Sequence, residues 1–183
     1  MIVATDLRPR LLPDRQFPAY AYLPGRYPHP VRHPLGHSYL SPEPSTQGAL
    51  NSEAFRWGID LFNHGYYWEA HEAWEALWQE AKGTPQHRPL YKGLILLAAS
   101  GVKVREGKAQ AARRHSARAV ATLRKLSAAS DGAFASALGM SVADLAAAAS
   151  NPALTGATEG EQRAVFAYLL GPSGATSTDR STV

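Results

Sequence analysis

After the first fifty residues, apolar positions recur along the chain with the period of an α-helix. Phe55, Ile59 and Phe62 follow one another at intervals of four and three residues, so they fall on one side of a helix. The Asn-Ser pair at 51–52 can cap this helix, and Gly65 stands where a residue in the left-handed conformation would end it. The pattern predicts a first helix between these two signals.

Three more helices follow from the same periodicity. The second is expected over residues 66–82, and the third runs to residue 107 from Pro89, a residue type favoured at the first helical position. Residues 90–102 are apolar nearly all round, which predicts that the third helix is the central and most buried one. The fourth helix, over 108–128, has an apolar side and a basic side.

Beyond residue 140, the sequence predicts two short helices and a disordered tail. Ser141 and Asp144 form a weak capping box for an alanine-rich helix over 141–150. An amphipathic helix is expected over 161–170, and the polar residues 171–183 are expected to be disordered. The last helix should turn three apolar side chains toward the body: Val165, Phe166 and Leu169. No segment alternates with period two for long enough to predict a strand.

The first fifty residues differ in composition from the rest. They hold nine of the thirteen prolines, which exclude a helix because proline lacks an amide donor and clashes with the preceding turn. They also hold five aromatic residues, which argue against disorder. We interpret residues 16–40 as an extended arm laid over the folded part and residues 41–49 as a linker.

These elements define the predicted fold class. It is all-α: a compact helical bundle with four main helices, one or two C-terminal helices and an extended proline-rich N-terminal arm. The expected division of the chain is an arm and linker over 1–50, a helical bundle domain over 51–170 and a disordered tail over 171–183.

Composition excludes several classes of protein. The chain has no cysteine, which excludes disulfides, thiolate metal sites and cysteine nucleophiles. The N-terminus lacks the apolar segment of a signal peptide, and the longest apolar run is far shorter than the roughly 18 residues of a membrane span. We therefore expect a cytoplasmic protein without a membrane partner.

Charge is distributed unevenly along the chain. The net charge is +4 and the pI about 9.5, which by itself suggests nucleic acid as a partner. However, residues 51–81 hold six acids and one base, and residues 82–127 hold eleven bases and one acid, as expected of complementary helices packed together. The basic side of the fourth helix, with Arg114, Arg118 and Lys125, has no interleaved aromatics, so nucleic-acid binding is only a second alternative.

The candidate chemistry lies in the second helix, within the segment FNHGYYWEAHEAWEALW. His71 and Glu75 are one helical turn apart, at the edge of the apolar face, with Glu72 beside them. This spacing lets an imidazole and a carboxylate share a metal, a proton or a hydrogen bond. The zincin motif is excluded because it needs histidine at position 75, and the di-iron motif because it needs glutamate where Trp68 stands.

Two interpretations of this cluster remain open at the sequence level. In the structural one, Glu72 or Glu75 pairs with Lys92 or Lys103 and His71 donates to a carbonyl group. In the functional one, His71 and Glu75 bind a divalent metal or a ligand with help from another histidine. The histidines that could approach are His29, His33, His37 and His64. The first three are spaced like ligands, but the prolines among them forbid the helix that this spacing requires, so we interpret them as docking contacts of the arm rather than as ligands.

The same segment, with the Gly-Leu-Ile stretch at 93–95 and VKVREGKAQAARRHSARAV, resembles the bacterial and archaeal family known as domain of unknown function 309. The resemblance covers about residues 51–127 and extends weakly to 141–145. It implies a compact all-helical fold and no established biochemical role. It also places the signature polar positions of the family on seven residues of this chain: Asn63, Gly65, Tyr67, Glu69, His71, Glu72 and Glu75.

The functional prediction is a binding or scaffold protein with a polar groove. Its partner is an unidentified protein or small molecule. The alternative is a metal-dependent hydrolase that uses His71 with Glu75 or Glu72, and the cofactor would then be a divalent metal. The candidate groove is formed by the following residues: Asn63, Tyr67, Glu69, His71, Glu72, Glu75 and Lys92.

Overall fold

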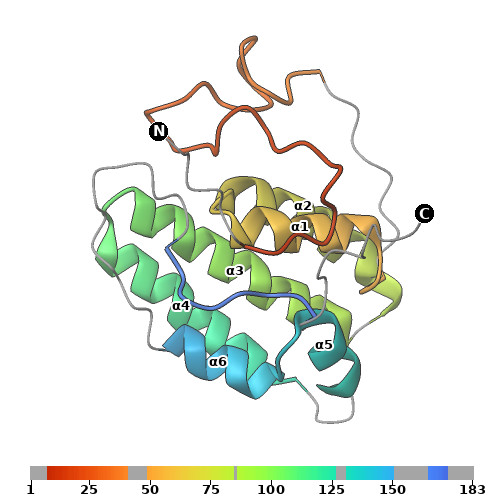
Figure 1. The fold of residues 1–183 in the computed structure, drawn as a ribbon. Helices are drawn as coiled ribbons and strands as arrows, with labels where there is room; N and C mark the ends of the chain where they lie inside the picture. Colours follow the sequence, from red (N-terminus) through yellow and green to blue (C-terminus); the bar gives the residue numbers. More distant parts are fainter. Residues whose placement is uncertain (1–7, 41–48, 85, 127–130, 151–164, 173–183) are drawn as a thin grey trace, which may run out of the picture.

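The computed structural model describes residues 8–40, 49–84, 86–126, 131–150 and 165–172 (Figure 1). In these ranges the chain forms six α-helices, one short 3₁₀ helix and no strand, which confirms the predicted all-α class. The elements are α1 Glu53–Asn63, α2 Tyr67–Glu80, η1 Ala81–Gly83, α3 His87–Arg105, α4 Ala109–Leu123, α5 Asp131–Leu138 and α6 Val142–Ser150.

The helices pack in chain order around α3. Helix α1 packs on α2, α2 on α3, α3 on α4, and α4 on α6. Figure 1 shows α3 between the pair α1 and α2 on one side and the pair α4 and α6 on the other. Most of α3 is buried, as its nearly continuous apolar sequence predicts, because it has neighbours on both sides.

The predicted start and end signals of the first helix are present. The Oγ atom of Ser52 accepts a hydrogen bond from the amide of Phe55 at 3.2 Å, which satisfies one of the free donors at the N-terminus of α1. Gly65 has φ +80° and allows the tight turn from α1 to α2, because a residue with a Cβ atom rarely adopts this conformation. The direction of α2 is therefore set by the turn that the sequence marks.

Helices α2 and α3 approach closely at Gly101. A Cβ atom at this position would lie 2.5 Å from the ring of Tyr67, whose side chain is buried against α3. Two helix backbones come this near only where one of them carries no side chain.

We expect the substitution Gly101→Ala to lower the free energy of unfolding by about 1–3 kcal/mol, because the new methyl group forces the Tyr67 ring out of its position. Chemical denaturation measures the change. The matched control is Gly132→Ala, since Gly132 is also helical and has no atom within 4 Å of the added Cβ. A Gly101→Ala variant as stable as the control would show that the two helices can separate without cost.

The prediction of a helix over residues 161–170 is wrong for the part of this segment that the structure describes. Residues 161–164 lie outside them, and Val165–Leu170 is not helical. The backbone of this segment is instead held by side chains of α1 and α2. Asn63 accepts from the amide of Leu170 at 2.9 Å and donates to its carbonyl group at 2.7 Å, while the amide of Val165 donates to the Tyr67 hydroxyl at 2.8 Å.

Phe166 shows why the apolar pattern was still informative. It is buried and stacks on Phe62, with ring centroids 5.1 Å apart. The segment therefore covers the core as predicted, but as an irregular strap rather than as a helix. We name residues 165–170 the C-terminal strap.

Other boundaries also differ from those expected. Helix α4 ends at Leu123 rather than near residue 128, and α5 was not predicted. The predicted capping residue of α6 is confirmed, because the Oγ atom of Ser141 accepts from the amide of Asp144 at 3.0 Å. Most of the predicted tail, residues 173–183, lies outside the described residues, as does nearly all of the predicted linker, at 41–48.

In the structure the arm comprises residues 8–40, and thus begins before the predicted residue 16; it lies over α1 and α2 (Figure 1). Its residues Ala21, Tyr22 and Leu23 are buried in the core. It is not extended throughout, because residues 23–40 form successive turns with backbone hydrogen bonds such as His33 N–H to His29 C=O at 3.1 Å. Proline interrupts helices but is compatible with turns, which accounts for this conformation.

Among the described residues, no single helix is long and apolar enough to cross a membrane. The pair α5 and α6 has the required length and composition only when taken together, and it is bent by 61°.

Candidate functional site

The signature polar residues of α1 and α2 fall into two groups. Asn63, Tyr67 and Glu69 are buried and bind other segments of the same chain. His71, Glu72 and Glu75 lie together at the surface of α2. The predicted groove is therefore divided: its first three residues hold the arm and the C-terminal strap, and the next three form an open cluster. The seventh, Lys92, lies over the Trp78 ring.

The helical position of Glu69 directs its side chain away from the apolar face of α2, so the helix alone does not predict that this side chain is buried. It is only 6% exposed because the arm covers it. One carboxylate oxygen accepts from the amide of Tyr22 at 2.8 Å and lies 3.0 Å from Nε2 of His37. Glu69 is therefore an anchor that holds the arm, and His37 is one of the arm residues that it binds.

Asp60 is a second anchor, and sequence reasoning missed it. Its carboxylate is fully buried in α1 and accepts from the amides of Leu11 and Leu12 at 2.7 and 2.9 Å. The Nε atom of Arg10 lies 3.8 Å away. The available signal was an acid between Ile59 and Leu61, since a charged residue inside an apolar run requires a partner.

Aromatic contacts join the arm to the same surface. Phe17 stacks on Tyr66 and on Trp57, with centroid distances of 4.8 and 5.5 Å. Tyr22 and His29 each contact the ring of Trp68. His29 therefore lies among aromatic rings.

The remaining histidines considered as extra ligands are also elsewhere. His64 is buried with its Nδ1 atom 2.8 Å from the carbonyl oxygen of Asp60, and His33 is exposed on the arm. Neither belongs to the group that surrounds His71.

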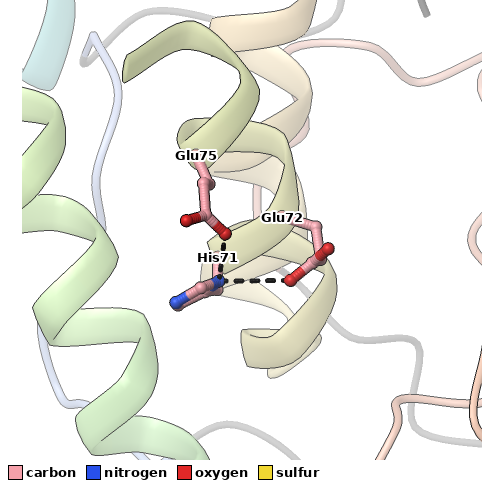
Figure 2. Close-up of side chains that lie close together, drawn as sticks. All are labelled: His71, Glu72 and Glu75. Atoms are coloured by element: carbon pink, nitrogen blue, oxygen red, sulfur yellow. Dashed lines mark ion pairs between the residues drawn. The ribbon is translucent and has the colours of Figure 1, made fainter. Parts of the chain in front are cut away.

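The open cluster consists of His71, Glu72 and Glu75 (Figure 2). The Nδ1 atom of His71 lies 3.3 Å from Oε1 of Glu72 and 3.8 Å from Oε2 of Glu75, and the three candidate ligand atoms all lie within 4.8 Å of one another. The side chains are 29%, 45% and 42% exposed. All three side chains are therefore partly exposed at the surface.

In the described part of the chain, Glu72 and Glu75 do not pair with Lys92 or Lys103, as the structural interpretation proposed. There, the ion pairs of Glu72 and Glu75 are with His71. Lys103 pairs with Glu106 at 2.5 Å, and Lys92 lies with its Nζ atom 5.3 Å from the centre of the Trp78 ring. No lysine or arginine within the described ranges forms an ion pair with the two carboxylates.

The Nδ1 atom of His71 is shielded from solvent and has no hydrogen-bond partner among the described residues. The two carboxylates approach it, but not in the directions of a hydrogen bond. In a tetrahedral metal site with bonds of about 2.0–2.2 Å, neighbouring ligand atoms are about 3.3–3.6 Å apart. Two of the three separations in the cluster, 3.3 and 3.8 Å, are close to this value, and all three lie within 4.8 Å, which is compatible with three ligand groups of one divalent metal ion.

His115, on α4, is a neighbour that sequence reasoning did not find. Burial lowers the pKa of its imidazole, and the positive charges of Arg118, Lys103 and Arg114 and the nearby His71 lower it further. Its Nδ1 atom is also buried without a hydrogen-bond partner in the described chain. No local spacing links His71 to a residue on another helix, so only the packing of the bundle reveals this proximity.

The hydroxyl of Tyr67, on α2, is buried where it accepts from the strap, and burial raises its pKa to about 12. In an unfolded chain a tyrosine ionises near pH 10. Above that pH the unfolded chain loses this proton while the folded chain keeps it, so the free energy of unfolding falls as pH rises from about 10 to about 12.

The expected loss for Tyr67 between about pH 9 and 11 is roughly 1 kcal/mol. Denaturation of the wild type and of Tyr67→Phe at both pH values measures it. The variant starts less stable, because its ring cannot accept the bond from Val165, but it should lose less on going to high pH. An equal loss in both proteins would contradict the assignment to Tyr67.

The basic side of α4 lies at the surface, as predicted. Arg114 and Arg118 on α4, and Lys125 just beyond its end, are exposed. The helix itself, Ala109–Leu123, contains no Phe, Tyr or Trp, so it offers no aromatic ring on which bases could stack.

Together, these features define a small all-α domain that carries a partly open cluster of one histidine and two glutamates on its second helix. Residues 55–115 match the family described as Domain of unknown function (DUF309), which confirms the predicted resemblance. The match covers the helical part of the chain from α1 into α4. The comparisons with curated proteins and with solved structures gave no match.

Proposed function

We propose that the protein is a non-enzymatic binding protein and that His71, Glu72 and Glu75 bind a divalent transition-metal ion. The observation that carries the proposal is the cluster itself: three ligand atoms lie within 4.8 Å of one another on an accessible surface. Imidazole nitrogen with carboxylate oxygen is a donor set suited to Zn²⁺ and to neighbouring transition metals.

The electrostatics of the cluster support a cationic ligand. Two carboxylates face one imidazole, and within the described residues no lysine or arginine forms an ion pair with them. Like charges held close together are unfavourable unless a cation lies between them. A metal ion would neutralise both carboxylates and bind the free Nδ1 atom of His71 at the same time.

The neighbours of α2 support a site whose backbone is held in place. Helix α2 is fixed on one side by α3 and on the other by the arm. The cluster residues stand on successive turns of this helix, so their backbone positions are set before a ligand arrives. Such preorganisation reduces the entropy lost on binding.

Titration calorimetry with Zn²⁺, Mn²⁺ and Mg²⁺ on metal-free protein tests the proposal. We expect Zn²⁺ to bind more tightly than Mg²⁺, and His71→Ala to weaken Zn²⁺ binding at least about 100-fold, since even indirect supports of a metal ligand are worth 10–100-fold. The control is His33→Ala, which removes an exposed histidine of the arm. Equal binding by the wild type and His71→Ala would refute the site.

Related measurements would detect two other functions. Hydrolysis of activated esters by metal-loaded wild type, abolished in His71→Ala, would identify the alternative metal-dependent hydrolase with Glu72 or Glu75 as its base. Salt-sensitive association with nucleic acid, abolished by reversing the charges of Arg114, Arg118 and Lys125, would support the second alternative. The donor set of the cluster favours the metal-binding proposal over both.

A further inference from the structure

The large apolar side chains that the structure leaves exposed are concentrated in one place. Within the described residues all five of them belong to the second half of the arm, and two are almost fully exposed: Leu35 at 75% and Leu40 at 84%. The other three are Tyr27, Val31 and Tyr39. Scattered apolar residues are normal on a protein surface, but such a concentration marks an interaction surface. We name residues 24–40 the arm loop.

The exposure of these side chains belongs to an ordered loop. Two parts of the loop backbone lie close together at Gly36, because a Cβ atom at this position would collide with the carbonyl oxygen of Pro30. Ser38 N–H donates to the same carbonyl group at 3.1 Å, and the Tyr20 hydroxyl donates to Pro28 at 2.7 Å while its ring stacks on Tyr27. The loop is tied to itself while its apolar side chains face outward.

The charge of the loop has a single sign. No aspartate or glutamate occurs between residues 15 and 42. Arg26 and Arg32 are exposed within the loop, beside the exposed His33. The loop thus presents positive charge and exposed apolar side chains, so the partner that complements it combines negative charge with an apolar region.

We propose that the arm loop docks on an anionic lipid surface, with Leu35 and Leu40 entering the bilayer interface and Arg26 and Arg32 contacting the headgroups. Aliphatic side chains enter such an interface, tyrosine favours the boundary between headgroups and acyl chains, and arginine is attracted by anionic lipids. The prediction of no membrane partner rests on the lack of a spanning segment in the sequence, and it does not concern a loop that docks on the surface.

The shape of the surface favours a lipid over an acidic protein. The arm loop, in orange, projects from the side of the molecule opposite α4 and α6 (Figure 1). Its two most exposed side chains, Leu35 and Leu40, stand out from the surface. A protein partner is usually recognised by side chains that fill complementary pockets, whereas a fluid bilayer accommodates a projecting loop.

Cosedimentation with vesicles tests the proposal on the full chain. We expect binding to vesicles of phosphatidylcholine mixed with phosphatidylglycerol and little binding to phosphatidylcholine alone. The double substitution Leu35→Ser with Leu40→Ser should weaken binding at least about tenfold, because the apolar area that enters the lipid is lost. Since both side chains are exposed, the helical circular dichroism spectrum should be unchanged.

A charge-matched pair of variants separates the loop from general basicity. Reversing Arg26 and Arg32 to glutamate should abolish binding, while reversing Arg113 and Arg124, which are exposed on and just beyond α4, should leave it within about threefold of the wild type. Equal losses in both pairs would overturn the proposal. So would no binding of the wild type to anionic vesicles, an outcome that leaves an acidic protein as the partner of the loop.

Discussion

Substitution of Asp60 by alanine is expected to lower the free energy of unfolding by about 3 to 5 kcal/mol, the usual range when one partner of a buried charged network is removed. The Asp60 carboxylate is fully buried and satisfies the amides of Leu11 and Leu12. Without it, both amides lose their acceptor and Arg10 loses its ion-pair partner, while the arm still covers the site. Urea denaturation measures the change, and limited proteolysis reports on release of the arm.

The conservative variant Asp60→Asn separates charge from shape. Its side-chain oxygen can still accept one of the two amide bonds, so we expect a smaller loss of stability than in Asp60→Ala. Proteolytic cleavage within residues 8–40 should increase in the order wild type, Asp60→Asn, Asp60→Ala. Unchanged stability and unchanged cleavage in Asp60→Ala would show that this carboxylate does not hold the arm.

Substitution of Glu69 by alanine is expected to cost about 2 to 4 kcal/mol, because the amide of Tyr22 is left buried without an acceptor and His37 loses its partner. The matched control is Glu80→Ala, on the same helix but exposed, which should change stability by less than about 0.5 kcal/mol. Equal effects of the two substitutions in denaturation would contradict the role of Glu69 as an anchor.

The two anchors should also be coupled, since both hold one continuous arm. If release at one anchor frees the whole arm, the double variant Asp60→Ala with Glu69→Ala loses less stability than the sum of the single losses. Additive losses would instead indicate that each anchor holds only its own part of the arm. The same denaturation experiments provide this comparison.

Local patterns in the sequence were sufficient for most of the fold. The spacing of Phe55, Ile59 and Phe62, the cap at Ser52 and the turn at Gly65 are all determined within a few residues of each other, and each is present in the structure. The apolar stretch of α3 predicted its central position for the same reason.

The elements that the sequence did not predict depend on contacts across the chain. The strap has an amphipathic pattern that favours a helix, yet Asn63 binds the backbone of Leu170 from 107 residues away. Hydrogen bonds of this kind override a local preference, and no pattern within residues 161–170 reveals them. The same limit applies to α5 and to the end of α4.

The candidate site shows the same division. His71 and Glu75 meet because they are one turn apart on a single helix, so their spacing predicted the contact. Helical geometry directed Glu69 away from the core, and only the arm, folded back over α2, buries it. Asp60 and His115 likewise acquire their neighbours from segments distant in sequence.

The most direct test of metal binding at the cluster is elemental analysis of the protein as purified, with wild type, His71→Ala and His33→Ala prepared side by side. We expect a stoichiometric amount of a transition metal in the wild type and in His33→Ala, and a strongly reduced amount in His71→Ala. Metal in none of the three proteins, even after exposure to Zn²⁺ and removal of the excess, would contradict a metal site at His71, Glu72 and Glu75.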